Sequence, residues 1–385
     1  MTSSITLAND VGPCTHSDGI DITTSGITVN LNGHTITGGS TTNTTTHEYI
    51  GVQLLNVNNV TLTGPGTITN FDAGVNVQGG SANVIKRITA HDNIAHVLIT
   101  GGVPGTNGNP ESNPCNFGDG ITTDFSSHNV ITNNATYHNG PFSGISLVDT
   151  STYNLVQYNV VTNQTVSNIE QTDNTTPGPC GPFGANIVGQ GRPHQDVGIR
   201  LEGPGAAHNL VTDNTSTDNQ LEGIAVFDNI CPGALPPPVP PNGTPPNAWN
   251  TIQNNKTLRN GAADGTDGIA VLSQGPAGTV CIASHTTIQN NVSNNNARAG
   301  IWMGGRGSNS NVIAGNTTDN NGAYGIYVSG PSGGTHPLPG STNNVIHSNT
   351  AVGNPTDDAF DGNPGCDANH WFGDFFTIVN QPCIH

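Results

Sequence analysis

Short apolar runs recur along the chain, and each of them directly follows a glycine. The glycines are Gly74, Gly120, Gly144, Gly198, Gly223, Gly268, Gly300 and Gly325. The tightest spacings are from Gly120 to Gly144, from Gly198 to Gly223 and from Gly300 to Gly325, about 24 or 25 residues each. A period in the twenties is typical of a solenoid, in which each repeat buries its apolar side chains on its neighbours. Longer intervals hold Pro- and Gly-rich insertions.

A second block follows each apolar run and keeps its own register: Asn, an apolar pair, one or two polar residues, and Asn again. "HNLVTDNTSTDN" and "SNVIAGNTTDNN" are two examples. Asn tolerates the left-handed backbone of sharp corners, and identical Asn side chains stacked strand above strand can hydrogen-bond as a ladder. The pattern therefore predicts an all-β chain: a single-stranded right-handed parallel β-helix, a solenoid with Asn-rich corners and terminal caps.

The repeat suggests three regions. Residues 1–73 are expected to form an N-terminal cap and the first coils, and residues 74–355 the repeats with insertions that wall a groove. Residues 356–385 leave the repeat and are expected to cap the last coil, with Trp371, Phe375 and Phe376 covering it. The seven cysteines include a pair, Cys366 and Cys383, that encloses a short loop and is the predicted disulfide. Cys115 with Cys180 and Cys231 with Cys281 are sterically plausible pairs, but sequence leaves their connectivity open.

The amino-acid composition limits the classes of molecule that the protein could bind. Charged residues make up 9% of the chain, and 26 acidic against 8 basic residues give a net charge of −18. This balance disfavours nucleic acid and anionic membranes, and no apolar stretch approaches the roughly 18 residues of a membrane helix. We expect a secreted or cell-surface protein, monomeric or trimeric, whose partner is a polysaccharide or oligosaccharide.

The segment "ITVNLNGHTITGG", followed by "VNNVTLTGPGTI" and the N-V-I-x-x-N coils, resembles the right-handed β-helix repeat family. That family includes carbohydrate-binding and sugar-hydrolase β-helix domains within a pectate-lyase-like superfamily. The resemblance covers nearly the whole chain and implies a fold and a carbohydrate-related function. Its motifs specify coils, and no catalytic residue carries over, because the paired acidic motifs with "GHG" and "RIK" of polygalacturonases are missing.

Alternation along a strand points to one outward face. With the Ile after each Gly inside the coil, the next residue and the one two further on point outward. Adjacent coils are about 4.8 Å apart, and retaining glycosidases hold two carboxyls roughly 5 to 5.5 Å apart. Acids on successive coils therefore predict catalytic carboxylates, one of them protonated as the general acid. The predicted catalytic residues are Glu202, Asp149, Asp228, Arg200 and Asp124.

The same face offers candidates for substrate binding. Aromatic rings can stack on sugars, and the flanking insertions bring further polar groups. These candidates are Trp302, Tyr327, Phe227, Arg306 and His194. Each assignment has a structural alternative: Arg200 and Glu202 could form only a surface ion pair, and Asp149 and Asp228 could cap turns at a corner.

The predicted function is a secreted carbohydrate-active enzyme that cleaves or rearranges a polysaccharide, most simply a glycoside hydrolase or glycosyl-transferring enzyme needing no cofactor. The alternatives are a calcium-dependent lyase or epimerase, and a non-catalytic glycan-binding or adhesin β-helix. Calcium is possible at turn acids, and the weak candidates are Asp264, Asp267 and Asp119.

Overall fold

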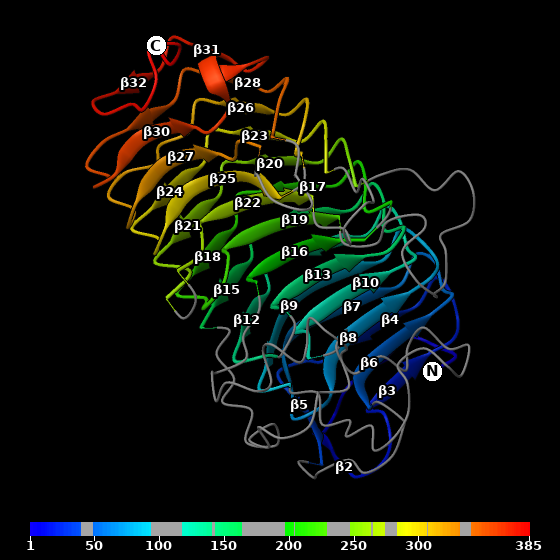
Figure 1. The fold of residues 1–385 in the computed structure, drawn as a ribbon. Helices are drawn as coiled ribbons and strands as arrows, with labels where there is room; N and C mark the ends of the chain where they lie inside the picture. Colours follow the sequence, from blue (N-terminus) through cyan, green and yellow to red (C-terminus); the bar gives the residue numbers. More distant parts are fainter. Residues whose placement is uncertain are drawn as a thin grey trace, which may run out of the picture. The chain divides into compact units, whose positions relative to one another are not determined.

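A computed structural model describes residues 1–39, 49–93, 118–140, 143–163, 197–203, 205–228, 247–262, 265–273, 283–305, 307–331 and 340–385, without the side chain of Asp228. The strands form two compact units, Met1–Ser146 with Asn159–Val197 and Leu147–Tyr158 with Gly198–His385. Each unit is a right-handed parallel β-helix whose coils carry up to three short strands (Figure 1). The predicted fold class is confirmed.

Parallel strands in the first unit pair in three rows. One row follows the glycine-led runs: β3 (Ile20–Ile22), β6 (Ile50–Leu55), β8 (Ala73–Gln78) and β10 (Ile121–Asp124). A second row is β1 (Ile5–Thr6), β4 (Thr28–Asn30), β7 (Thr61–Thr69), β9 (Val84–His91) and β11 (Val130–Thr132). The third row joins β2 (Val11–Cys14), β5 (Thr35–Gly38), the C-terminal parts of β7 and β9, β12 (Ala135–Tyr137) and β15 (Val160–Thr162). Strand β13 (Ile145–Val148) follows Gly144.

The second unit repeats the plan, and its first row is here called the Gly-Ile sheet. This sheet contains β16 (Ile199–Glu202), β19 (Ile224–Asp228), β22 (Ile269–Ser273), β25 (Ala299–Gly305), β27 (Tyr324–Val328) and β30 (Asp357–Asp361). The second row is β14 (Leu155–Gln157), β17 (Leu210–Thr212), β20 (Thr251–Gln253), β23 (Thr287–Gln289), β26 (Val312–Ala314), β28 (Val345–His347) and β31 (His370–Phe372). The third row is β18 (Thr215–Thr217), β21 (Lys256–Leu258) and β24 (Val292–Asn294), then, past a bridge at Thr317, β29 (Thr350–Ala351) and β32 (Phe375–Phe376).

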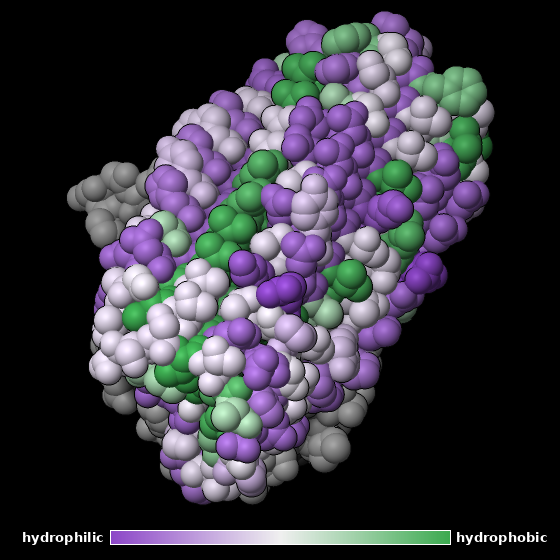
Figure 2. All heavy atoms as spheres, turned by 180° about the vertical axis from the view of Figure 1, so that it is seen from behind, coloured by the Kyte–Doolittle hydropathy of each residue, from purple (hydrophilic) through white to green (hydrophobic). Residues whose placement is uncertain are grey.

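The core of the second unit is made by the inward residues of these strands. Ile199, Leu201, Ile224 and Val226 are completely buried, and the pattern continues through Val328. Polar residues dominate the outer surface seen in Figure 2. The glycine before each run is required by packing: a Cβ on Gly268 would lie 1.9 Å from Ser293 Oγ and 2.4 Å from Asn296 Nδ2. The repeat glycine therefore marks the point where the strand passes too close to the side chains of a neighbouring corner to leave room for a Cβ.

Asparagine ladders line the corners of the second unit. At the corner between the second and third rows, Asn214, Asn255, Asn291, Asn316 and Asn349 follow one another, coil after coil. Each donates its backbone N–H and its side-chain Nδ2 to Oδ1 of the next, and its Nδ2 also reaches a backbone carbonyl. A second ladder runs from Asn219 through Asn260, Asn296 and Asn321 to Asn354. The residues before these Asn have left-handed backbones, for example Asn254 (φ 55°) and Asn290 (φ 55°).

The C-terminal segment extends the repeat further than the sequence indicated. Strands β30, β31 and β32 pair in register with β27, β28 and β29, so one more coil continues through Phe376. Trp371 is buried in that coil, whereas Phe375 is 61% exposed and covers no core, because it lies on the outer side of β32. A short 3-10 helix, η4 (Pro364–Cys366), follows β30, and the predicted Cys366–Cys383 disulfide is present. Cys115, Cys180, Cys231 and Cys281 lie outside the described residues.

Candidate functional site

Arg200 and Glu202 both point outward from β16, as the alternation predicted. Leu201 between them is completely buried, and Arg200 Nε lies 2.5 Å from Glu202 Oε2. The two side chains are only 11% and 16% exposed, so this is a largely buried ion pair and not an open surface contact. The Arg200 guanidinium also lies over the ring of Phe227, 4.8 Å from its centroid. Phe227 is 6% exposed and packs against Arg200.

Asp228 and Asp149 do not share the register position of Glu202. The strand register pairs Glu202 with Phe227 and places the backbone of Asp228 opposite Ser273. Asp149 comes directly after β13 with a left-handed backbone (φ 53°), and its N–H donates to the Glu202 carbonyl at 3.0 Å. It is therefore a corner residue, which was the structural alternative. Asp124 ends β10 in the first unit, in register with Gln78.

The metal candidates that the structure describes have protein partners. Asp267 is completely buried, and its carboxylate accepts hydrogen bonds from Arg298 Nε at 3.0 Å, from Arg298 Nη2 and from the Ala299 N–H at 2.9 Å. Asp119 is 1% exposed and accepts from Thr122 Oγ1 at 2.8 Å. Across the described ranges, no group of three or more His, Cys, Asp or Glu side chains is arranged to hold a metal ion. Asp264, His194, Arg306 and most of the insertions lie outside the described residues.

Aromatic side chains form a column on the last three strands of the Gly-Ile sheet. Trp302 on β25, Tyr327 on β27 and Phe360 on β30 occupy one register position. The Trp302 and Tyr327 rings are nearly parallel, 9° apart, with centroids 6.3 Å from each other, and Phe360 lies 5.3 Å from Tyr327. All three are partly exposed. Trp302 Nε1 donates to Ser329 Oγ at 2.9 Å, which fixes the indole. We call Trp302, Tyr327 and Phe360 the aromatic column.

Arg298 supports this column from the preceding corner. Its guanidinium carbon lies 3.9 Å from the Trp302 ring centroid and 6.0 Å from that of Tyr327. Its carbonyl accepts hydrogen bonds from the N–H groups of Ala323 and Tyr324, at 2.8 and 2.9 Å. Burial alone would lower the pKa of Arg298, but the hydrogen bonds and charge of Asp267 outweigh it and raise that pKa. The cation is therefore held in place between a buried carboxylate and an indole face.

Two ionisable groups border the column. Tyr324 stacks on Tyr327 with centroids 4.8 Å apart, and Asp357 is its register partner on β30. Burial, then the neighbouring Asp358, raises the pKa of Asp357. Burial, then Tyr327 and Asp357, raises the pKa of the Tyr324 phenol. A carboxyl that keeps its proton to higher pH than usual can donate a hydrogen bond to a bound oxygen.

Sequence reasoning found Trp302 and Tyr327, and considered Arg298 only as a possible base of a lyase, but it missed Tyr324, Asp357 and Phe360. Phe360 was assigned to the cap because Asp358 stands where Gly325 stands one coil earlier. The pattern "DDAFD" nevertheless matches the spacing of "YGIYV" once that glycine is not required. Arg298 offered a weaker signal. It is one of only eight basic residues in the chain, and it stands two positions before the repeat glycine Gly300.

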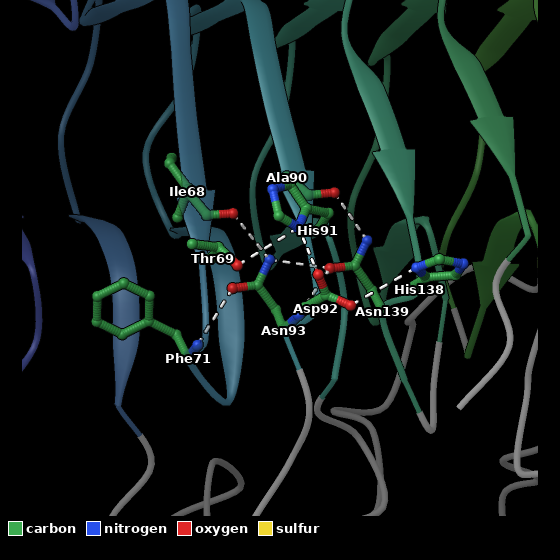
Figure 3. A network of polar contacts seen from close by, with 9 residues as sticks. All are labelled: Ile68, Thr69, Phe71, Ala90, His91, Asp92, Asn93, His138 and Asn139. Carbon is green, nitrogen blue, oxygen red and sulfur yellow. Dashed lines mark hydrogen bonds and ion pairs between the residues drawn. The ribbon is translucent and has the colours of Figure 1, made fainter. Parts of the chain in front are cut away.

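A separate polar cluster lies at a corner of the first unit, shown in Figure 3. Asp92 stands between two imidazoles: its Oδ2 is 2.6 Å from His91 Nδ1 and its Oδ1 is 3.6 Å from His138 Nδ1. The His91 ring stacks on Tyr137 at 4.6 Å. Directly beneath, Asn93 donates its Nδ2 to Asn139 Oδ1 at 2.9 Å, which continues a corner ladder. The carboxylate orients the His91 ring.

Comparison with known proteins supports the fold. No protein-family model matches the chain, and no curated protein matches it. Among solved structures, the periplasmic alginate epimerase AlgG matches with a TM-score of 0.53 at 12% identity, over 86% of this chain and 61% of that one. The Dettilon tailspike protein matches with a TM-score of 0.55 at 16% identity, over 96% of this chain and 60% of that one.

The chain thus spans about three fifths of the length of these two structures. Like these two structures, it folds as a right-handed parallel β-helix. At this level of identity, the likeness concerns the fold alone. Within the described residues, no helix has the length and apolar character needed to cross a membrane.

Proposed function

We propose that the protein is a carbohydrate-active β-helix that binds a polysaccharide along the aromatic column and processes it there. The observation that carries the proposal is the register of Trp302, Tyr327 and Phe360, which presents one partly exposed ring on each of three successive coils. Coils repeat at about 4.8 Å, so the column offers a regularly spaced apolar surface to the faces of a linear chain of sugar rings.

The surroundings of the column suit a sugar chain better than other polymers. The net charge of −18 repels nucleic acid, and Asp267 neutralises Arg298, the cation nearest to the rings. Tyr324 and Asp357 add groups that can hydrogen-bond to hydroxyls. One of the structures that share the fold is named an alginate epimerase, which acts on a polysaccharide. A periplasmic or extracellular location is consistent with that comparison.

We propose hydrolysis or glycosyl transfer as the reaction. Asp357, whose pKa is raised by burial and by Asp358, is the group suited to protonate a leaving oxygen. Glu202, held by Arg200, is an alternative to Asp357 and not its catalytic partner, because it lies five strands away on the same sheet, roughly 24 Å at about 4.8 Å per strand. A lyase or epimerase would instead remove a proton next to a uronate carboxyl, and an adhesin would bind without turnover. We expect calcium dependence only if the protein is a lyase or epimerase.

The test is a panel of neutral and uronate polysaccharides incubated with the wild type, Trp302→Ala, Asp357→Asn and Glu202→Gln, with and without chelator. Binding, new reducing ends and the ultraviolet absorbance of unsaturated uronates are recorded. We expect Trp302→Ala to weaken binding about tenfold, the equivalent of one lost ring contact. Tyr153→Ala is the matched control, because Tyr153 is an exposed aromatic (53%) of the same unit outside the column.

The remaining outcomes separate the alternatives. Reducing ends that appear without absorbance and vanish in Asp357→Asn or Glu202→Gln support hydrolysis and identify the carboxylate. Chelator-sensitive absorbance would replace hydrolysis by lyase chemistry. Binding without turnover on every polysaccharide would leave the adhesin function, and unchanged binding by Trp302→Ala would remove the aromatic column from the site.

A further inference from the structure

A row of uncharged polar side chains faces outward from the first unit. Gln53 on β6, Asn76 on β8 and Thr122 on β10 stand in register on successive coils. The residues on either side of Gln53 and Asn76, such as Val52 and Val75, are completely buried, so these polar side chains point away from the core. They are nevertheless shielded from solvent, with 8%, 3% and 7% exposure. We call Gln53, Asn76 and Thr122 the polar row.

Two atoms of this row lack hydrogen-bond partners. In the part of the chain that the structure describes, neither Gln53 Nε2 nor Asn76 Oδ1 has a partner, and both atoms are buried. Thr122 differs, because its Oγ1 donates to Asp119 Oδ2 at 2.8 Å and contacts Ser146 Oγ. Buried polar atoms are almost always paired in folded proteins, so an unpaired neighbouring set indicates a missing partner.

The chemistry of the two atoms defines that partner. Gln53 Nε2 is a donor and Asn76 Oδ1 is an acceptor, and they belong to adjacent coils about 4.8 Å apart. A group that satisfies both must accept one hydrogen bond and donate another. A hydroxyl does both, whereas a carboxylate has no hydrogen to donate and an ammonium has no lone pair to accept.

The charges nearby favour an uncharged ligand. Asp21 is the register partner of Gln53 on the preceding coil, and Asp119 and Asp124 flank Thr122. These carboxylates would repel a uronate. We infer that Gln53 and Asn76 form a subsite for a hydroxyl of a neutral sugar residue, so that the polysaccharide taken by this protein is uncharged. This inference rests on the proposed function and names its substrate class.

The experiment compares matched neutral and charged ligands. Oligosaccharides of glucan, mannan, galactan and xylan are titrated calorimetrically against the wild type, and so are the C6-oxidised uronate forms of the hexose chains. We expect at least one neutral oligosaccharide to bind, and its oxidised form to bind at least tenfold more weakly. Equal or tighter binding of the oxidised form would overturn the inference.

Variants of Asn76 test the subsite itself. Val and Thr side chains have nearly the same shape, but only Thr has an oxygen. The variants Asn76→Val and Asn76→Thr therefore differ in their ability to hydrogen-bond. Because Asn76 Oδ1 has no partner in the described protein, Asn76→Val should leave the unfolding midpoint unchanged or higher. We expect it to weaken binding of the neutral ligand three- to tenfold, with Asn76→Thr closer to the wild type; Gln53→Leu should act like Asn76→Val.

The outcomes distinguish this inference from the proposed function. Full affinity in both Asn76→Val and Gln53→Leu would mean that only water pairs these atoms, and the subsite would be rejected while the aromatic column stands. Loss of binding in Asn76→Val with none in Trp302→Ala would support the subsite and reject the column. A failure of every oligosaccharide to bind would reject both.

Discussion

Asn255 and Asn291 occupy the same corner on successive coils, and Asn255 donates both its backbone N–H (2.9 Å) and its Nδ2 (3.1 Å) to Asn291 Oδ1. Asn291 in turn donates to the Ile252 carbonyl at 2.9 Å and to Asn316. One side chain therefore serves three coils, and it is 1% exposed.

Removal of one ladder side chain should be costly. Asn291→Ala removes the acceptor of the buried Asn255 N–H and one donor to the Ile252 carbonyl, and we expect about 2–4 kcal/mol of destabilisation. Urea denaturation followed by circular dichroism measures it. Lys256→Ala, at an exposed position of β21, is the control and should change stability by less than about 0.5 kcal/mol. Similar midpoints for the two variants would contradict the role of the ladder.

The repeat glycines should not tolerate a methyl group. Gly268→Ala would place its Cβ against Ser293 Oγ and Asn296 Nδ2, and we expect a loss of about 1–3 kcal/mol from overpacking. The double variant Gly268→Ala with Ser293→Ala removes the nearer of the two atoms. It should recover part of the loss relative to Ser293→Ala alone in thermal unfolding. No recovery would place the strain elsewhere.

The ion pair beneath the aromatic column is expected to be needed for stability. Arg298→Met leaves the Asp267 carboxyl completely buried and without its cation, and we expect about 3–5 kcal/mol of destabilisation. Arg298→Met combined with Asp267→Asn removes the unpaired acid and should be more stable than Arg298→Met alone. Chemical denaturation of the three proteins tests this, and equal stability of the single and double variants would contradict it.

Asp358 links stability to acid conditions. Burial raises the pKa of this carboxyl, but hydrogen bonds from Thr377 and Asn354 outweigh burial and lower it. A lowered folded-state pKa gives stability that is present above the unfolded value, about 3.9, and is lost as pH falls through the folded value.

The corresponding measurement compares wild type with Asp358→Asn between about pH 7 and about pH 3. At neutral pH we expect the wild type to be more stable by about 1.5–3 kcal/mol, since Asp358 accepts from the Thr377 N–H at 2.9 Å and from Asn354 Nδ2 at 2.9 Å. This advantage should shrink in acid. If the difference in stability between wild type and Asp358→Asn did not vary with pH, the charge of Asp358 would not contribute to the stability of the folded protein.

The sequence could specify the coils because the physical constraint repeats with them. Gly268 must avoid Asn296, Asn296 must meet Asn321, and the same distances recur on each coil, so the residue pattern records them. The alternation within strands likewise predicted that Arg200 and Glu202 would share the outward face.

The candidate site was harder to predict, because it depends on departures from the pattern. Arg298 reaches Trp302 from a corner, and only the three-dimensional path of the chain brings them within 3.9 Å. Ala225, Ala270 and Leu272 point outward by alternation but are buried, so position along a strand did not establish exposure. Asp357 and Phe360 were missed because one substituted glycine hid a complete coil.

The hydrogen bonds from one ladder asparagine to the next run in one direction within the second unit, and this has a consequence for assembly. Side-chain amides donate toward the next coil, and two ladders end on carboxylates, where Asn354 meets Asp358 and Asn349 meets Asp374. A carboxylate has no amide hydrogen to pass on. An identical coil arriving at this end would bring an Asn carbonyl against a negative oxygen instead of a donor. Open strand edges are templates for fibre growth; beside Asp358 the edge is already covered by Thr377 and Ile378, and at Asp374 an arriving coil would find no amide hydrogen.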